Sequence, residues 1–221
     1  MRYPILATDY DGTLATDGRV EDTTLDALCR FRRAGGTVFL VTGRRLGPLQ
    51  QIFPHLDLCD RVVAENGAVL YHPASDRAQM LAAPPPATFI SALKARGAEP
   101  LAIGQVIVAT WQPYESAVVE TIREFELDLQ IILNKRAIMV LPKGVDKAFG
   151  LKRLLCDLGL SGDRVAGVGD AENDIHLLNT CGYKVAVANA LPALKARADY
   201  VTAGERGSGV SECIDRLLEL T

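Results

Sequence analysis

The chain has 221 residues, and its 24 basic and 27 acidic side chains leave a formal net charge of −3. Hydrophobic residues make up 48% of it and charged residues 23%, which are ordinary values for a globular protein with a substantial core. The lack of a basic excess argues against a nucleic-acid partner, and no apolar run approaches the roughly 20 residues of a membrane-spanning helix. The five cysteines are dispersed, so we expect reduced thiols. Together with the lack of a long apolar run, this predicts a cytoplasmic location and no membrane partner.

The first third of the chain alternates apolar runs with helical patterns. An apolar run over 3–8 predicts a buried strand, and apolar positions at helical spacing predict a helix over 20–35. A second strand is expected over 37–43, a short helix over 45–56, and a third strand with a turn in it over 61–71. This alternation predicts a doubly wound parallel α/β sheet, and the lack of a polar face on the strands predicts helices on both sides.

The alternation stops at three consecutive prolines, Pro84 to Pro86, which favour an extended linker. A small α+β unit of different element order follows. Its expected elements are a helix over 87–97, a strand over 105–111, a helix over 115–125, and strands over 129–134 and 136–142 joined by a turn at Asn134-Lys135. We therefore predict an α+β cap of residues 84–143, inserted in a core formed by residues 1–83 and 144–221.

The first pattern resumes after the insert. A helix is expected over 144–160, and an apolar strand that ends in Asp170 follows it. The remaining expected elements are a helix over 171–182, a strand over 184–189, a helix over 191–198, a short strand over 200–204 and a closing helix over 209–220. The predicted architecture is thus one α/β core with one insert.

Polar residues stand at the ends of the predicted strands. Asp9 and Asp11 follow the first strand, Thr42 ends the second, and Asp170 ends the strand after the insert. Ligands of open α/β sheets bind beyond the carboxyl ends of the strands, so these residues are the candidates for chemistry. Two residues apart in an extended segment, Asp9 and Asp11 can face the same way.

The acids at the strand ends predict a divalent metal. Asp170 and Asp174 are four residues apart at a helix start and share a face, where like charges repel. Mg²⁺ takes hard oxygen ligands, usually one or two carboxylates with waters and a substrate phosphate, and explains the cluster better than packing does. Lys147, at the start of the helix that re-enters the core, can neutralise a phosphate.

Four motifs stand in a recognisable order: "DYDGT" at 9–13, "VTGR" at 41–44, Lys147, and "GDAEND" at 169–174. In this order the chain resembles the haloacid dehalogenase superfamily of phosphohydrolases over nearly its whole length outside the insert. "ENGA" at 65–68 is similar to the Cof-type branch, which carries its cap where this insert lies. The short length resembles the small-cap relatives, which include phosphoglycolate and sucrose-phosphate phosphatases.

The resemblance implies a role for each motif residue. Asp9 is the implied nucleophile, which forms an aspartyl phosphate, and Asp11 is the implied acid that protonates the leaving oxygen and then activates water. The implied Mg²⁺ site consists of Asp9, Asp11 through its carbonyl, Asp170, and Asp174 directly or through water. The implied phosphate-binding residues are Thr42, Gly43, Lys147 and Asn173.

The implied function is an Mg²⁺-dependent phosphomonoester hydrolase that acts on a small phosphorylated metabolite of the sugar phosphate or phosphoglycolate class. The dehalogenases of the superfamily lack the second acid, so the presence of Asp11 favours phosphoryl transfer. A phosphotransferase or mutase on the same core is an alternative. A receiver-like signalling module is another, but such modules have no inserted cap. The oligomeric state stays open.

Other residues have a structural interpretation beside the functional one. Asp17-Gly18 has no partner motif and is expected to close a surface hairpin over 12–20. Trp111 is expected to pack within the cap rather than stack on a substrate. For the remaining residues, pocket and ordinary turn or surface positions are equally favoured: Arg44, Glu65, Asn66, Asn134, Lys135 and Arg136.

Overall fold

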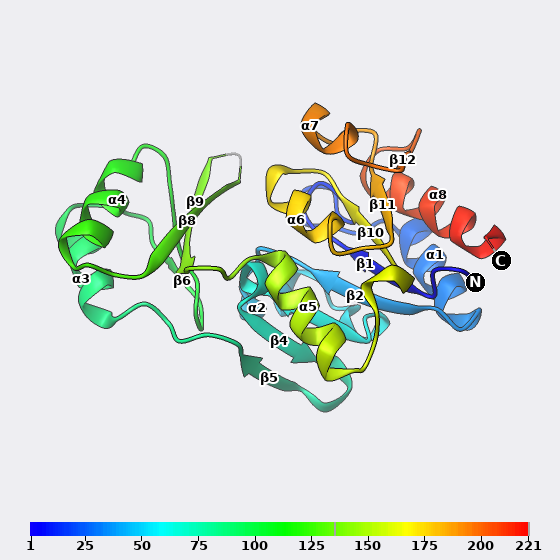
Figure 1. Cartoon of the computed structure of the whole chain (residues 1–221), viewed down its shortest axis with the longest axis horizontal. Helices are drawn as coiled ribbons and strands as arrows, with labels where there is room; N and C mark the ends of the chain where they lie inside the picture. Colours follow the sequence, from blue (N-terminus) through cyan, green and yellow to red (C-terminus); the bar gives the residue numbers. More distant parts are fainter. Residues whose placement is uncertain (135, 221) are drawn as a thin grey trace.

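A computed structural model describes residues 1–134 and 136–220, and in this part of the chain the strands form two sheets (Figure 1). The larger sheet has eight strands in the order β12-β11-β10-β1-β2-β3-β4-β5. Neighbours from β12 to β3 are parallel, whereas β4 and β5 are added antiparallel at one edge. The predicted α/β fold with a mainly parallel sheet is confirmed.

Helices cover both faces of the larger sheet (Figure 1). Within β1, Leu6 belongs to the same apolar cluster as Phe31 and Ile214 of two helices, while Ile5 joins the cluster of Leu151 on the other face. The strands are β1 (Ile5–Thr8), β2 (Thr37–Val41), β3 (Arg61–Ala64), β4 (Val69–His72), β5 (Arg77–Met80), β10 (Val165–Gly169), β11 (Tyr183–Ala186) and β12 (Tyr200–Val201). The helices are α1 (Asp22–Arg33), α2 (Leu46–Ile52), α5 (Lys147–Asp157), α6 (Ile175–Leu178), α7 (Pro192–Lys195) and α8 (Arg206–Glu219).

Two predicted elements differ in the structure. The third strand with a turn is two antiparallel strands, β3 and β4, because Glu65 and Asn66 have φ values of 52° and 54° and reverse the chain. The strand β5 then extends the sheet, which the sequence did not predict. The helix expected over 171–182 is the short α6, preceded by a 3-10 turn over Glu172–Asp174.

The smaller sheet has the antiparallel order β6-β7-β9-β8 and lies beyond the carboxyl ends of the parallel strands (Figure 1). Its face with Val108 and Ile138 packs on Phe89 and Val118 of two helices. The opposite face, with Met139, packs with the core of the larger sheet. The elements of this smaller unit are α3 (Ala87–Ala95), β6 (Ala102–Ile103), β7 (Val108–Trp111), α4 (Glu115–Glu124), β8 (Leu129–Asn134) and β9 (Ala137–Pro142).

The predicted cap range of 84–143 encloses all these elements. Lys135 of the predicted turn lies outside the described residues. The strand β7 begins at Val108 rather than at Gln105, because the backbone N–H groups of Gln105, Val106 and Ile107 donate instead to the Glu65 carboxylate at 2.9, 2.8 and 2.9 Å. This contact joins the smaller unit to the end of β3. Since Glu65 is buried, its charge is stabilised there by the three amides.

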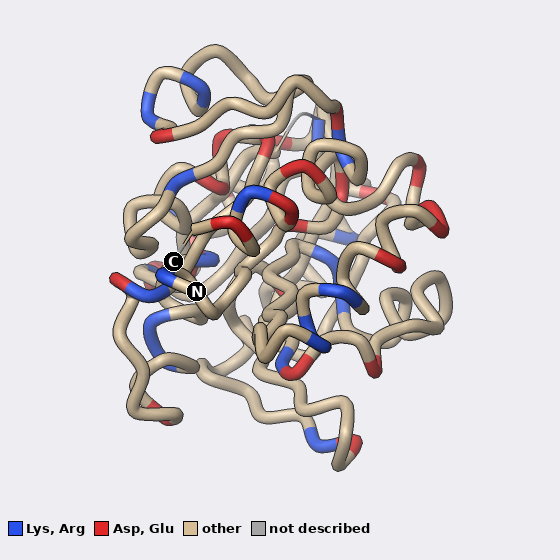
Figure 2. The backbone as a smooth tube through the Cα atoms, turned by 90° about the vertical axis from the view of Figure 1, so that its right-hand side faces the viewer, with Lys and Arg blue, Asp and Glu red and all other residues tan. Residues whose placement is uncertain are grey.

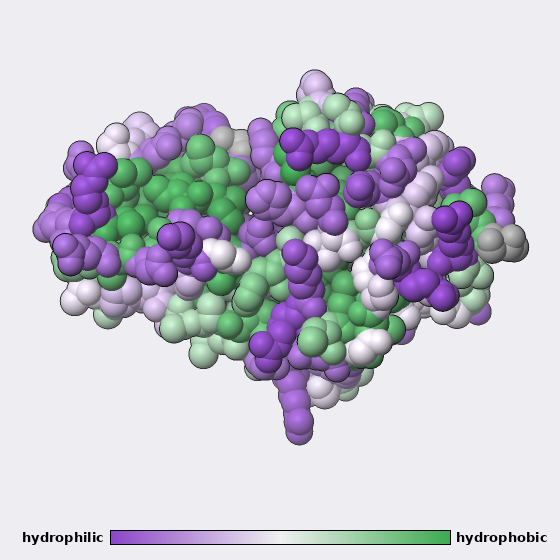
Figure 3. All heavy atoms as spheres, in the orientation of Figure 1, coloured by the Kyte–Doolittle hydropathy of each residue, from purple (hydrophilic) through white to green (hydrophobic). Residues whose placement is uncertain are grey.

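The surface carries charges of both signs. Figure 2 shows basic and acidic positions interspersed along the backbone rather than gathered by sign. Figure 3 shows hydrophobic residues gathered on the visible side of the smaller unit. Exposed large apolar side chains of this unit are Ile103, Trp111, Val119, Phe125 and Leu133. Within residues 1–134 and 136–220, no helix is both long and apolar enough to cross a membrane.

Candidate active site

The site begins where β1 ends. The Asp9 N–H donates to the Val168 carbonyl at 3.0 Å, so the pairing with β10 continues one residue beyond the strand and fixes the Asp9 backbone. Lys147 begins α5, whose N-cap Asp146 accepts a hydrogen bond from the Phe149 N–H at 2.8 Å. These two elements bring the Asp9 carboxylate and the Lys147 ammonium together, although 138 residues separate them.

Lys147 bonds to two buried acids. Its Nζ lies 2.5 Å from Oδ1 of Asp9 and 2.7 Å from Oδ1 of Asp174, and the side chains of the three residues are 1%, 7% and 0% exposed. Burial favours neutral forms, but two carboxylates hold the ammonium by charge and by hydrogen bonds. The lysine therefore stands between the predicted nucleophile and a predicted metal residue.

Three protein donors hold the Asp174 carboxylate. Its Oδ2 accepts the backbone N–H groups of Asp170 and Ala171, both at 3.0 Å, and its Oδ1 accepts Lys147. A carboxylate has about four acceptor sites, so these three donors leave room for about one further bond. Asp174 therefore positions Lys147 and the turn after β10.

Asp170 completes the acid cluster. Its Oδ1 accepts a hydrogen bond from the Thr13 hydroxyl at 3.1 Å. Gly12 has a φ of +85°, and a Cβ at this position would lie 2.5 Å from Oδ2 of Asp170. A glycine is needed here, because only a residue without a side chain lets the loop after β1 approach this carboxylate so closely.

The cluster fits a hard divalent cation. One carboxylate oxygen from each of Asp9, Asp170 and Asp174 lies within 4.8 Å of the others, and all three residues are buried. Three carboxylates face one ammonium there, so negative charge remains in excess. Oxygen donors of this kind, supplemented by water and a phosphate, are what Mg²⁺ prefers. The structure places Asp9, Asp170 and Asp174 together, while their role as metal ligands and the identity of a bound ion stay predictions.

Burial and acidic neighbours shift the pKa values in the cluster. Desolvation raises the pKa of Asp9 from 3.8 to about 8; Lys147 opposes this rise, while Asp174 and Asp170 add to it. Burial lowers the pKa of Lys147, but Asp174 and Asp9 outweigh burial and the net shift is upward. The charges are therefore balanced best when a cation joins the acids and keeps Asp9 ionised.

Asp11 lies apart from this buried cluster. Its two carboxylate oxygens accept hydrogen bonds from Nε and Nη2 of Arg44 at 2.6 and 2.7 Å, and the two side chains are 42% and 32% exposed. The Arg44 guanidinium also lies over the Tyr10 ring, 5.5 Å from its centroid. The sequence favoured a pocket and a surface position equally for Arg44. The structure shows that Arg44 positions Asp11, the second acid of the first motif.

A cavity of about 410 Å³ separates the motif residues from the smaller unit. Asp9, Asp11 and Gly43 line it from the larger sheet. Trp111 and Met139 are among the residues that line it from the smaller sheet. The expectation that Trp111 packs within the unit is wrong, because it is 41% exposed and lies on the sheet face turned to the cavity.

Other predicted phosphate-binding residues are held by neighbours. The Thr42 hydroxyl accepts the Arg44 N–H at 3.1 Å. The Asn173 side-chain amide donates to Oδ1 of Asn66 at 3.3 Å, and both line a separate cavity of about 290 Å³ next to β8. Their contact with a phosphate stays a prediction, as does the metal bond of the Asp11 carbonyl. Asn66 belongs to the site region rather than to a simple surface turn, because it is buried.

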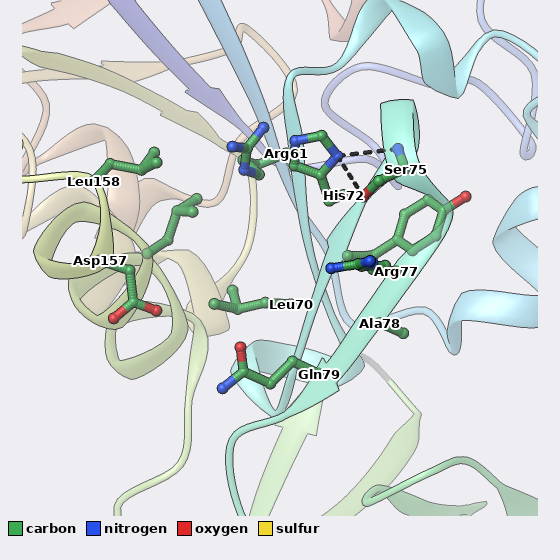
Figure 4. Close-up of a pocket in the computed structure, with 11 residues that line it drawn as sticks. Arg61, Leu70, His72, Ser75, Arg77, Ala78, Gln79, Asp157 and Leu158 are labelled. Atoms are coloured by element: carbon green, nitrogen blue, oxygen red, sulfur yellow. Dashed lines mark hydrogen bonds between the residues drawn. The ribbon is translucent and has the colours of Figure 1, made fainter.

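A further cavity, of about 450 Å³, lies at the antiparallel edge of the larger sheet (Figure 4). Arg61, His72, Arg77 and Asp157 are among its lining residues, and His72 Nδ1 accepts the Ser75 N–H at 3.1 Å. It lies beside Arg61, where β3 begins, and so at the amino end of the parallel strands. None of the motif residues lines this cavity, which therefore plays no part in the predicted chemistry.

Sequence reasoning missed two residues at the site. Arg45 lines the 410 Å³ cavity, and Thr13 supports Asp170. Thr13 is the last residue of the first motif and Arg45 follows the second, so their position in the sequence was the available signal. The predicted turn at Asp17-Gly18 is present, since Thr16 and Arg19 exchange backbone hydrogen bonds of 2.8 and 2.9 Å around it.

The fold and the site define an α/β protein with a buried acid and lysine centre at the carboxyl ends of parallel strands, where ligands of such sheets bind. The family model for haloacid dehalogenase-like hydrolases matches residues 6–85 and 103–214. The chain belongs to this family, and the expected class of enzyme, a phosphatase of the haloacid dehalogenase type, is confirmed.

Two relatives are similar over nearly the whole chain. Phosphoglycolate phosphatase of Methanothermobacter thermautotrophicus is 32% identical over 223 residues, covering 96% of this chain and 98% of that protein. Phosphoglycolate phosphatase 1 of Saccharolobus solfataricus is 30% identical, covering 97% and 96%. Among solved structures, a putative HAD/COF-like hydrolase from Plasmodium vivax has a TM-score of 0.84 at 23% identity, covering 100% and 97%. This last likeness concerns the fold alone.

Proposed function

We propose that this protein is an Mg²⁺-dependent phosphomonoester hydrolase that acts on a small phosphorylated metabolite through an aspartyl phosphate on Asp9. The observation that carries the proposal is the buried Lys147 ammonium, 2.5 Å from Asp9 and 2.7 Å from Asp174, beside a cluster of three acids. A carboxylate is a poor nucleophile toward a phosphate dianion unless cations cancel the repulsion. Lys147 supplies one such cation.

The chemistry divides between two acids in different surroundings. A carboxylate oxygen of Asp9 attacks phosphorus, and the bond from phosphorus to the ester oxygen breaks. Asp11, in its neutral form, gives its proton to the leaving oxygen. Asp11 then takes a proton from the water that attacks the aspartyl phosphate, which restores Asp9 and releases phosphate. Arg44 orients Asp11 for both transfers through its two hydrogen bonds.

Asp9, Asp170 and the Asp11 carbonyl would hold Mg²⁺, with Asp174 beside them. Bound there, the ion supplies positive charge to the transferring phosphoryl group. Thr42, Gly43 and Asn173 are the proposed neighbours of the phosphate. The apolar sheet face with Met139 excludes water from the cavity while the aspartyl phosphate forms.

Phosphoglycolate is the leading substrate within the proposed class. Two relatives that cover almost the entire chain carry the name phosphoglycolate phosphatase. The proposed cytoplasmic location suits such a metabolite. Transfer of the phosphoryl group to a sugar instead of water would appear as a phosphorylated sugar when acceptor sugars are added.

The test compares Asp9→Asn with Asp17→Asn, a matched change in the exposed turn after the motif. We expect Asp9→Asn to lose at least about 10³-fold in kcat for Mg²⁺-dependent phosphate release from phosphoglycolate, because the nucleophile is gone. Asp17→Asn should retain wild-type kcat. Mass spectrometry of acid-quenched wild-type enzyme should find a phosphoryl group on Asp9, and turnover by a contaminant-free Asp9→Asn enzyme would contradict the assignment.

A further inference from the structure

Arg44 ends the second motif and Arg45 follows it, and the partners of the two arginines differ. Arg44 gives two N–H donors to the Asp11 carboxylate, so its charge is balanced by the protein itself. Arg45 forms no ion pair with any residue in the described ranges. Its Nη1 donates to the backbone carbonyl of Ile103 in β6, at 3.0 Å. Arg45, the N-cap of α2, therefore brings an unneutralised charge to the smaller unit.

This charge faces the same cavity as the proposed nucleophile. Asp9 and Arg45 both line the 410 Å³ cavity. Asp9 pairs with Lys147, which it shares with Asp174, and Asp11 pairs with Arg44. Within the described residues, neither lining acid forms an ion pair with Arg45. The other lining residues are mostly apolar: Pro48, Ala102, Ile107, Ala109, Trp111, Ala137 and Met139.

Such surroundings favour an anion. A guanidinium presents five N–H donors in a planar fork, and the Ile103 carbonyl occupies one of them. Because apolar walls lower the local dielectric, a charge-assisted pair is stronger there than in water.

We propose that Arg45 binds a carboxylate on the leaving-group side of the substrate, so that the enzyme prefers phosphomonoesters of small hydroxy acids over those of neutral alcohols. The inference rests on the proposed function and adds the residue that recognises the carboxylate of the substrate. The phosphate lies at Asp9, and the carboxylate lies toward β6, where the Arg45 guanidinium ends. A neutral sugar would leave the Arg45 charge unpaired when the cavity closes.

The experiment uses two substrates that differ in one group. Phosphoglycolate carries a carboxylate where 2-hydroxyethyl phosphate carries a neutral hydroxymethyl group. We expect Arg45→Gln to raise KM for phosphoglycolate about 10- to 100-fold, as the loss of a charge-assisted hydrogen-bond pair does. Its kcat/KM for 2-hydroxyethyl phosphate should stay within about 3-fold of wild type. Arg77→Gln, the same change at an exposed site on β5, is the control and should alter neither substrate.

Arg45→Lys keeps the charge but not the fork, and it should recover only part of the affinity. An equal loss toward both substrates in Arg45→Gln would overturn the proposal, since it would mean that Arg45 acts through its bond to Ile103 alone. A wild-type enzyme that hydrolyses both substrates equally well would also overturn it, and would leave the phosphatase function standing.

A failure of the phosphatase function itself has a different signature. In that case no phosphomonoester is hydrolysed with Mg²⁺, and binding replaces kinetics as the readout. Calorimetry of wild type and Arg45→Gln with phosphoglycolate and with 2-hydroxyethyl phosphate then tests the carboxylate contact directly. A selective loss of phosphoglycolate affinity in Arg45→Gln supports the contact, and equal affinities of both proteins for it contradict the contact.

Discussion

The site contains two cations that bind carboxylates, Lys147 and Arg44, and their surroundings differ. The Lys147 contacts with Asp9 and Asp174 are buried, whereas the side chains of Arg44 and Asp11 are 32% and 42% exposed. A buried charge that loses its partner is destabilising by about 3–5 kcal/mol, while an exposed pair contributes about 0–1 kcal/mol. The buried group is thus fixed in one geometry, and the exposed pair can separate and re-form.

This difference suits the proposed division of labour. A nucleophile benefits from a fixed position, and Asp9 is held by strand pairing and by Lys147. An acid that gives and takes protons needs access to a leaving oxygen and to water, and Asp11 lies at the edge of the cavity beside solvent. The contrast can be tested by removing one cation at a time.

The largest effect is expected for Lys147→Met, which leaves Asp9 and Asp174 without their shared cation. Unfolding free energy should fall by about 3–5 kcal/mol, and kcat should fall at least about 10³-fold. Denaturant titration and phosphate release measure the two quantities. Lys152→Met, an exposed lysine on the same helix, should change both little. A Lys147→Met protein with wild-type stability would mean that the buried contacts contribute nothing.

A smaller effect is expected for Arg44→Gln, which removes the cation of the exposed pair. Unfolding free energy should change by less than about 1 kcal/mol, because solvent already screens this pair. The kcat for phosphate release should fall, though by less than in Lys147→Met, since Asp11 loses the two hydrogen bonds that orient it for proton transfer. A stability loss as large as that of Lys147→Met would remove the distinction between the two contacts.

The smallest effect is expected for the pH dependence of the thermal stabilisation that Mg²⁺ gives to the buried cluster. With a pKa of about 8 against 3.8 for an ordinary aspartate, folded Asp9 keeps a proton that the unfolded chain has lost. Without metal, its contribution to stability therefore falls as pH rises through this interval. Mg²⁺ binds the ionised form, so its stabilisation should raise Tm by a few degrees more at pH 8 than at pH 6.

Thermal scans with and without Mg²⁺ provide this measurement. Asp170→Asn should lose the response because it removes an acid of the cluster, whereas Asp17→Asn should keep it. A Tm increase of equal size at both pH values would show that the proton on Asp9 and the cation do not compete.

The sequence predicted the parts of the fold that depend on local pattern. Apolar runs identified the parallel strands, and the acids that follow β1 and β10 were expected to meet because carboxyl ends of parallel strands share an edge. The division between β3 and β4 was missed, because it depends on the left-handed backbone of Glu65 and Asn66. In a single sequence, "ENGA" indicates a turn but not whether the strands around it pair.

Side-chain partners across large separations were beyond the sequence. Nothing in the local pattern says that Arg44 bonds to Asp11 while Arg45 reaches Ile103. The exposure of Trp111 was also misjudged, because a strand of alternating pattern does not reveal which of its faces meets another unit. Such choices are made by tertiary packing, which places residues far apart in the chain against one another.

The contact of Glu65 with the start of β7 limits how the smaller unit can move. Three buried or half-buried amides bond to this one carboxylate, and separating them from it would leave several polar groups without partners. A motion that admits substrate at low cost keeps the contact intact. Such a motion is a rotation of the smaller sheet about residues 105–107. It widens the cavity most at Asn134 of β8 and Ala137 of β9, which lie at the opposite end of the sheet.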